Sequence, residues 1–249
     1  MRIWRICAVR NTLFAAALAL AVLTHGCQAG ISRRVVEQAM SGKAGANVPA
    51  DTVKKAGEQA IPTIFEVVRD SSDEMVPDRA LLIMVGMTAM HTADPCAPFI
   101  RKVLADAKEP ERIRVLAAKM LSLYWEAPEP ERALISHARS DASEAVRIQC
   151  VASSGGLMLW KLPRTKDGAV DGPVRQLLAD VLQDKSTKVR EQACNTVAVI
   201  ASEALYEGTE LDWCRRLLVQ AKQDKDYRVR KAAVEGLFVL ESIRKTSRS

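Results

Sequence analysis

The side chains best suited to metal or acid–base chemistry are few in this sequence and lie far apart. His25, His91 and His137 are its only histidines. His91 and Cys96 lie five residues apart and could share a metal ion, but a zinc site normally takes four ligands. No second Cys or His pair accompanies them. We therefore expect both to be ordinary residues at helix ends, and we predict no bound metal and no cofactor.

Two other kinds of active site also find little support. Two histidines beyond the first thirty residues offer few resources for a His-based triad. The pair Gly155-Gly156 is the nearest approach to a glycine-rich phosphate loop, but it lies inside a predicted helix and does not follow a strand. The sequence thus predicts a protein without catalytic residues.

A repeated pattern dominates the second half of the chain. An Asp is followed by Val-Arg five and six residues later, and by a small residue three positions further on. The three copies are Asp141/Val146/Arg147/Cys150, Asp184/Val189/Arg190/Ala193 and Asp224/Val229/Arg230/Ala233. Such spacing is typical of a solenoid built from helix pairs. Ile113-Arg114 belongs to a looser copy, and in a still earlier one Pro77 replaces the Arg.

Each copy follows a segment with helical periodicity. In residues 173–182 the apolar positions 174, 177, 178, 181 and 182 form one stripe of a 3.6-residue helix, and Pro173 suits its first turn. One unit is therefore a helix A, a tight turn containing the Asp, and a helix B. Stacked units bury the faces that single helices leave open. We place about five units, at residues 57–92, 94–126, 129–160, 171–204 and 208–244. A linker and helical cap at 28–56 precede them.

The unit resembles the HEAT family, in particular its short bacterial, PBS-lyase-type repeats. The family pattern Gly-x-x-Ala-Ile/Val-Pro begins at Gly57, and the Asp…Val-Arg…Ala…Leu part recurs in the later units. The resemblance implies an all-α fold, a right-handed α-solenoid over residues 57–249 that ends in a short basic tail. It also implies that the recurrent Asp and Arg residues form a structural ladder between units. In addition, an Asp before helix B suits an N-cap.

The first 27 residues have the pattern of a signal peptide. Arg2, Arg5 and Arg10 precede an apolar run of eleven residues at 13–23, and a membrane-spanning helix needs roughly 20. Residues 23–27 resemble a bacterial lipobox ending at Cys27, although Thr24 stands where that motif prefers Leu. We expect Cys27 to carry lipid, and cleavage after Ala29 is the alternative. Export to the periplasm or to a lipid-anchored position follows from either.

Removal of residues 1–27 changes the interpretation of the net charge. The formal charge falls from +6 to +3, because residues 1–27 hold three arginines and no acid. The remaining body is close to neutral, so we expect no nucleic-acid partner, and contact with a membrane only through the lipid.

Four cysteines remain after export, namely Cys96, Cys150, Cys194 and Cys214. An exported protein can form disulfides, and Cys194 with Cys214 is the first pair to examine because the two lie on successive helices. Cys150 occupies the register of Ala193 and Ala233, so a small buried core residue is the favoured interpretation. The interruption at 160–172 suits either a binding loop or a tolerated insertion.

The function predicted from these features is a protein-binding scaffold in the cell envelope. The partner, which the sequence does not identify, would bind along the B helices. Polar residues off the apolar stripe of those helices are the candidate contacts: Arg79, Lys119, Gln149, Glu191, Lys231 and Glu235. The alternative is an enzyme on a HEAT-like fold. Some HEAT-like proteins are similar to metal hydroxylases built on His-Glu pairs, which this chain lacks, and others are DNA glycosylases or bilin lyases.

Overall fold

The computed structural model describes residues 31–42, 47–88, 96–124, 127–161, 172–206 and 212–246. In these ranges every regular element is a helix, and there is no β-strand. No described helix is both long and apolar enough to cross a membrane. The predicted signal peptide with Cys27, His91, and most of the 160–172 segment lie outside the described residues.

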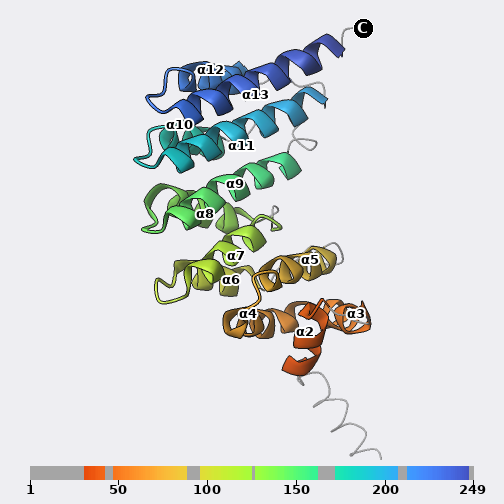
Figure 1. Cartoon of the computed structure of the whole chain (residues 1–249). Coiled ribbons are helices and arrows are strands. Elements are labelled where there is room, and N and C mark those ends of the chain that lie inside the picture. Colours follow the sequence, from red (N-terminus) through yellow and green to blue (C-terminus); the bar gives the residue numbers. More distant parts are fainter. Residues whose placement is uncertain are drawn as a thin grey trace, which may run out of the picture.

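Five helix pairs form the body of the molecule. The first helices of the pairs, here called A helices, are α4 (Ile61–Asp70), α6 (Ala97–Ala105), α8 (Pro128–Ser140), α10 (Gly172–Val181) and α12 (Asp212–Ala221). The second helices, called B helices, are α5 (Val76–Thr88), α7 (Glu111–Leu121), α9 (Glu144–Lys161), α11 (Thr187–Tyr206) and α13 (Tyr227–Thr246). Figure 1 shows the pairs stacked on one another from α4–α5 to α12–α13. The predicted all-α solenoid is therefore confirmed.

Two further helices precede the first pair. They are α2 (Arg33–Met40) and α3 (Asn47–Ala56), and a short 3-10 helix, η1 (Gly57–Ala60), joins α3 to α4. The repeat pattern starts at Gly57, but the first A helix begins only at Ile61. Gly57 has φ of 59°, a left-handed conformation that favours glycine and breaks the helix between α3 and α4.

Proline fixes the starts of several A helices. α4, α6 and α8 each carry a proline in their first two positions, at Pro62, Pro98 and Pro128. The missing N–H of proline costs nothing there, because the first N–H groups of a helix have no partner within the helix. These prolines place the boundary between successive units.

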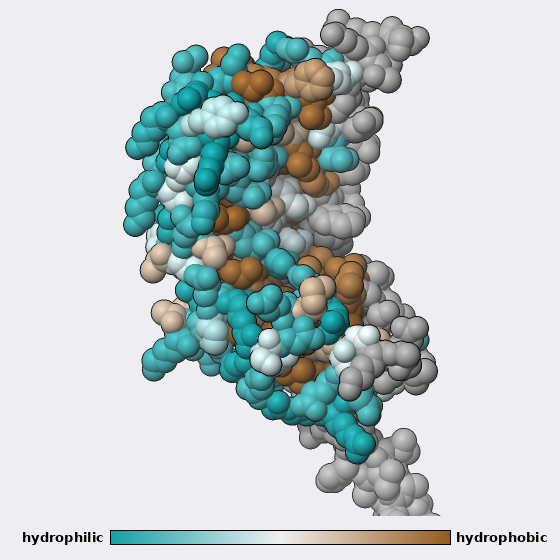
Figure 2. All heavy atoms as spheres, viewed as in Figure 1, coloured by the Kyte–Doolittle hydropathy of each residue, from teal (hydrophilic) through white to brown (hydrophobic). Residues whose placement is uncertain are grey.

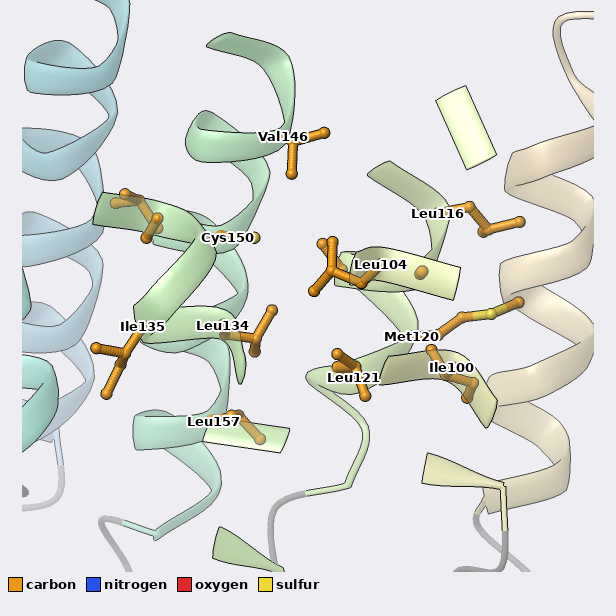
Figure 3. Close-up of a cluster of buried hydrophobic side chains, with 14 of the residues drawn as sticks. Ile100, Leu104, Leu116, Met120, Leu121, Leu134, Ile135, Val146, Cys150 and Leu157 are labelled. Atoms are coloured by element: carbon orange, nitrogen blue, oxygen red, sulfur yellow. The ribbon is translucent and has the colours of Figure 1, made fainter. Parts of the chain in front are cut away.

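The core runs without interruption through the stack. Between the second and third pairs, Leu104, Leu121, Leu134 and Cys150 are all fully buried, and Figure 3 shows side chains from α6, α7, α8 and α9 meeting there. Ala and other small residues keep the B helices close together. The closest approach is at Gly155 of α9, where an added Cβ atom would lie 2.3 Å from Cγ2 of Thr196 on α11.

Candidate interaction surface

The five B helices lie side by side, because α5, α7, α9, α11 and α13 each pack against the next. One side of this layer remains open to solvent and is called here the B-helix face. Its exposed and partly exposed residues include Leu82, Val85, Lys119, Ile148, Gln149, Glu191, Asn195, Val199, Lys231, Glu235 and Val239.

Five of the six polar residues predicted as contacts lie on this face, but they differ in their exposure and in whether they already have a polar partner within the chain. Lys119 bridges two B helices, since its Nζ lies 3.1 Å from Asp78 Oδ1 on α5. Gln149 is partly buried and donates to Ser153 Oγ at 3.1 Å. Lys231 and Glu235 are exposed neighbours on α13, 3.7 Å apart. The face thus has charges of both signs, partly satisfied by one another.

Arg79 departs from the predicted set. Its Nη1 donates to Asp73 Oδ2 at 2.7 Å and to the Met40 carbonyl at 2.9 Å. The side chain is therefore bound to the turn of the first pair and to the end of α2. It stabilises the junction with the N-terminal helices and offers no free charge to a partner.

The exposed apolar residues of this face were missed by sequence reasoning. Leu82 is 71% exposed, Val199 49% and Val239 42%, on three different B helices. Figure 2 shows brown patches over the helices, whereas the side of the molecule that carries the A–B turns is mostly teal. Single exposed apolar residues are common on protein surfaces, but here they recur on the same face of the B-helix layer.

The repeated Asp and Arg residues lie on a different part of the molecule, at the A–B turns. Arg147 donates through Nε and Nη2 to both carboxylate oxygens of Asp184 in the next pair, at 3.1 and 3.2 Å. Arg190 does the same to Asp224, at 2.8 and 3.0 Å. Nη1 of each arginine, Arg230 included, donates to the backbone carbonyl of the Asp in its own turn. Each arginine thus fixes its own turn, and the first two also hold the next one.

Arg114 extends this row by one unit. It is buried, and its Nη2 is bonded to the carboxylate of Asp141 while its Nε donates to the Leu104 carbonyl at 2.9 Å. The Ile113-Arg114 pair was the signal for it in the sequence. The Asp of its own turn, Asp106, is displaced, so Arg114 bonds to the end of α6 instead.

The N-cap role predicted for the aspartates is wrong. Asp141 and Asp184 close the turn by accepting from the N–H of the residue two positions later, Ser143 and Ser186. Those serines, which directly precede the B helices, perform the capping: Val146 N donates to Ser143 Oγ at 3.1 Å. Ser143 and Ser186 also donate to glutamates of the preceding B helix at 2.6 Å. They form a second row of contacts between units.

Hydrogen bonds lower the pKa values of two ladder carboxyls. Arg190 holds the pKa of Asp224 below its ordinary value. Burial alone would raise the pKa of Asp141, but hydrogen bonds from Ser143, His137 and Arg114 outweigh it, so this pKa is lowered too. A depressed carboxyl pKa stabilises the fold above the unfolded-state value of about 4, and this stabilisation is lost as the pH falls through the folded-state pKa.

We therefore expect the urea midpoint to fall steeply as the pH drops below about 4, where the unfolded chain binds more protons than the folded one. Urea titrations between neutral and acid pH measure this dependence. Asp224→Asn should lower stability at neutral pH and flatten the acid dependence. A variant curve that runs parallel to the wild type would contradict the assignment.

The cysteines in the described part of the chain are unpaired and buried. Cys96, Cys150, Cys194 and Cys214 are all free, so no disulfide joins Cys194 to Cys214 in this structure. Burial raises the pKa of the Cys194 thiol to about 12 and that of Cys150 further still. Asp141 contributes to the shift at Cys150, yet this thiol has no access to solvent and cannot act as a nucleophile in the folded state.

His137 lies beside the same carboxylate, with Nδ1 2.9 Å from Asp141 Oδ2. This His–Asp contact was not predicted, although the four-residue spacing places both side chains on one side of the C-terminal turn of α8. Asp141 already accepts bonds from Arg114 and Ser143, so it is fully engaged in the ladder. Among the residues that the structure describes, no group of three or more His, Cys, Asp and Glu could hold a metal ion.

A polar cavity of about 390 Å³ opens between the last two A–B turns. Asp184, Arg190 and Asp224 of the ladder line it together with Gln183, Gln220 and Gln223. Asp184 and Asp224 are already paired with Arg147 and Arg190, so the cavity adds no acid–base pair to the ladder.

No family model and no curated protein sequence matches this chain. Several solved structures align with most of this chain. Human deoxyhypusine hydroxylase in complex with glycerol aligns over 91% of this chain and 99% of its own, with 15% identity and a TM-score of 0.39. A designed armadillo repeat protein in complex with the peptide (KR)4 aligns over 84% and 98%, with 16% identity and a TM-score of 0.38.

The YibA protein of Escherichia coli aligns over 78% of this chain and 75% of its own, with 15% identity and a TM-score of 0.38. These likenesses are too weak to indicate what the chain binds or whether it has an activity. The stacked helix pairs, joined at their turns by Asp–Arg contacts, define an α-helical repeat protein, a solenoid of helix pairs.

Proposed function

We propose that the chain is a non-catalytic scaffold of the bacterial cell envelope that binds another protein along its B-helix face. The observation that carries this proposal is the recurrence of exposed apolar residues, such as Leu82, Val199 and Val239, among charges of both signs on one face. Burial of apolar side chains is the main driving force of most protein–protein association. The surrounding charges select a partner by complementarity.

The non-catalytic part of the proposal is supported by the side chains that could do chemistry. Cys150 and Cys194 are fully buried thiols with raised pKa values, and Asp141 is held by three hydrogen-bond partners. Catalytic groups need access to a substrate and a pKa near the working pH. These residues instead stabilise the contacts between helix pairs.

Binding is tested with two valines that differ only in their position. Val199 on the B-helix face is 49% exposed, and Val219 on the A helix α12 is 51% exposed. A protein captured from envelope extract by immobilised residues 28–249 is purified and titrated by calorimetry against both Asp variants. We expect Val199→Asp to weaken binding by about tenfold or more, as removal of a central apolar contact does, and Val219→Asp to leave it unchanged. The reverse result would place the partner on the A helices.

The location in the envelope rests on the residues before 28. An Arg-rich start, a short apolar run and the lipobox-like end at Cys27 support export followed by lipid attachment. We expect intact mass spectrometry of envelope-expressed protein to show a chain that begins at a lipidated Cys27, and Cys27→Ala to remain unprocessed. A mature chain that starts at Gly30 would rule out the lipid and keep the export.

A further inference from the structure

The last B helix carries a row of residues on the side that the next unit covers in the earlier pairs. Arg230, Val234, Leu237 and Glu241 of α13 recur at intervals of four, three and four residues, so they share one side of the helix. Val234 and Glu241 are exposed, whereas Leu237 is partly buried and also packs against the core. We call this row the outer stripe. In Figure 1, α12 and α13 form the end of the stack opposite α2 and α3.

The same register in the preceding pair is buried by the next unit. On α11, Cys194, Val197 and Ala201 occupy the positions of Val234, Leu237 and Glu241, and they are at most 4% exposed. Val234 by contrast is 50% exposed, and Tyr227 and Phe238 beside the stripe are 67% and 69% exposed. The terminal unit of a solenoid normally has a polar outer side. An apolar one of this size indicates that another chain covers it.

Arg230, the charged residue at the start of the outer stripe, indicates which groups the covering chain must supply. Arg114, Arg147 and Arg190 each pair with a carboxylate of the following unit. Arg230 donates only to the carbonyls of Asp224 and Lys225, and no acidic side chain in the described part of the chain pairs with it. The occupant therefore needs a carboxylate near Arg230 and apolar groups next to it.

The outer stripe itself meets this requirement. We propose that two copies of the chain associate through α13, with the two helices antiparallel across a two-fold axis between Val234 and Leu237. Arg230 of one copy then lies opposite Glu241 of the other, and Val234 lies opposite Leu237. A two-fold interface needs a self-complementary surface, and the order Arg, Val, Leu, Glu is complementary to its own reverse. Glu241 is available for this, because its ion pair with Arg215 is long at 3.8 Å and both side chains are about half exposed.

The test uses charge reversal and sedimentation equilibrium of residues 28–249. The wild type should sediment as a dimer. Arg230→Glu and Glu241→Arg should each sediment as monomers, because like charges then meet at both ends of the interface. An equimolar mixture of the two variants should form a dimer, since both ends of the mixed interface then join an arginine of one variant to a glutamate of the other.

Two controls separate this surface from others. Val234→Asp should give a folded monomer without disturbing the turn that Arg230 supports, as checked by circular dichroism. Val199→Asp on the B-helix face should remain a dimer, so loss of partner binding and loss of self-association are distinguishable. A monomeric wild type would overturn the proposal and leave a foreign acidic helix as the occupant. A mixture of the two charge variants that stays monomeric would overturn the antiparallel pairing.

Discussion

Replacement of Arg114 by alanine is expected to lower the free energy of unfolding by about 3–5 kcal/mol, the cost of leaving a buried charge without its partner. The Asp141 side chain is only 1% exposed, and its carboxylate would lose the guanidinium between α7 and the turn after α8. The Leu104 carbonyl at the end of α6 would lose its donor as well. Urea unfolding followed by circular dichroism measures the loss.

Arg139 provides a matched control. It also joins two helix pairs, through a contact of 2.7 Å to Asp180 on α10, but the two side chains are 42% and 40% exposed. Exposed ion pairs contribute about 0–1 kcal/mol, so Arg139→Ala should change stability little. The double variant Arg114→Met/Asp141→Asn should recover much of the loss, because no unpaired charge remains buried. Equal destabilisation by Arg114→Ala and Arg139→Ala would show that burial does not determine the strength of the ladder.

The repeat could be identified from the sequence because each unit places the same residues in the same surroundings. Val146, Val189 and Val229 are fully buried in three successive units, and the arginines that follow them all bind their own turns. A local environment that recurs in the structure must recur in the sequence. The helix pairs and the ladder are predictable for this reason.

The surface was harder to predict, because periodicity assigns residues to helices without assigning them to the inside or outside of the stack. Val197 and Val199 illustrate this on α11: the first is fully buried and the second is 49% exposed. B helices have neighbours on three sides, so most of their circumference is apolar and the exposed stripe is narrow. Arg79 shows the opposite difficulty. An arginine at this position was expected to be a free surface charge. Only the fold places Met40 and Asp73 where they accept hydrogen bonds from its guanidinium.

Gly155 and Gly156 could not be distinguished by sequence at all, yet they are expected to respond to alanine in opposite directions. At Gly156 the nearest atom to an added Cβ is Ser122 Cβ at 3.8 Å, an ordinary contact. Gly156→Ala should therefore raise stability by up to about 1 kcal/mol, the difference in helix propensity between the two residues. At Gly155 the added methyl would meet Thr196 Cγ2 at 2.3 Å, so α9 and α11 would have to move apart.

Gly155→Ala is accordingly expected to destabilise the protein by about 1–3 kcal/mol, the usual cost of overpacking. Thr196 cannot move aside easily, because it is 5% exposed and a β-branched side chain in a helix has a restricted χ1 angle. Thr196→Ser removes Cγ2 and keeps the hydroxyl that accepts from Gln192 Nε2 at 3.1 Å. The remaining contacts of the new methyl, to the Cβ atom of residue 196 and to Ile200 Cδ1, would both be 3.6 Å. The double variant Gly155→Ala/Thr196→Ser should therefore unfold at a higher urea concentration than Gly155→Ala alone. If it does not, the clash with Thr196 is not what limits the approach of α9 to α11.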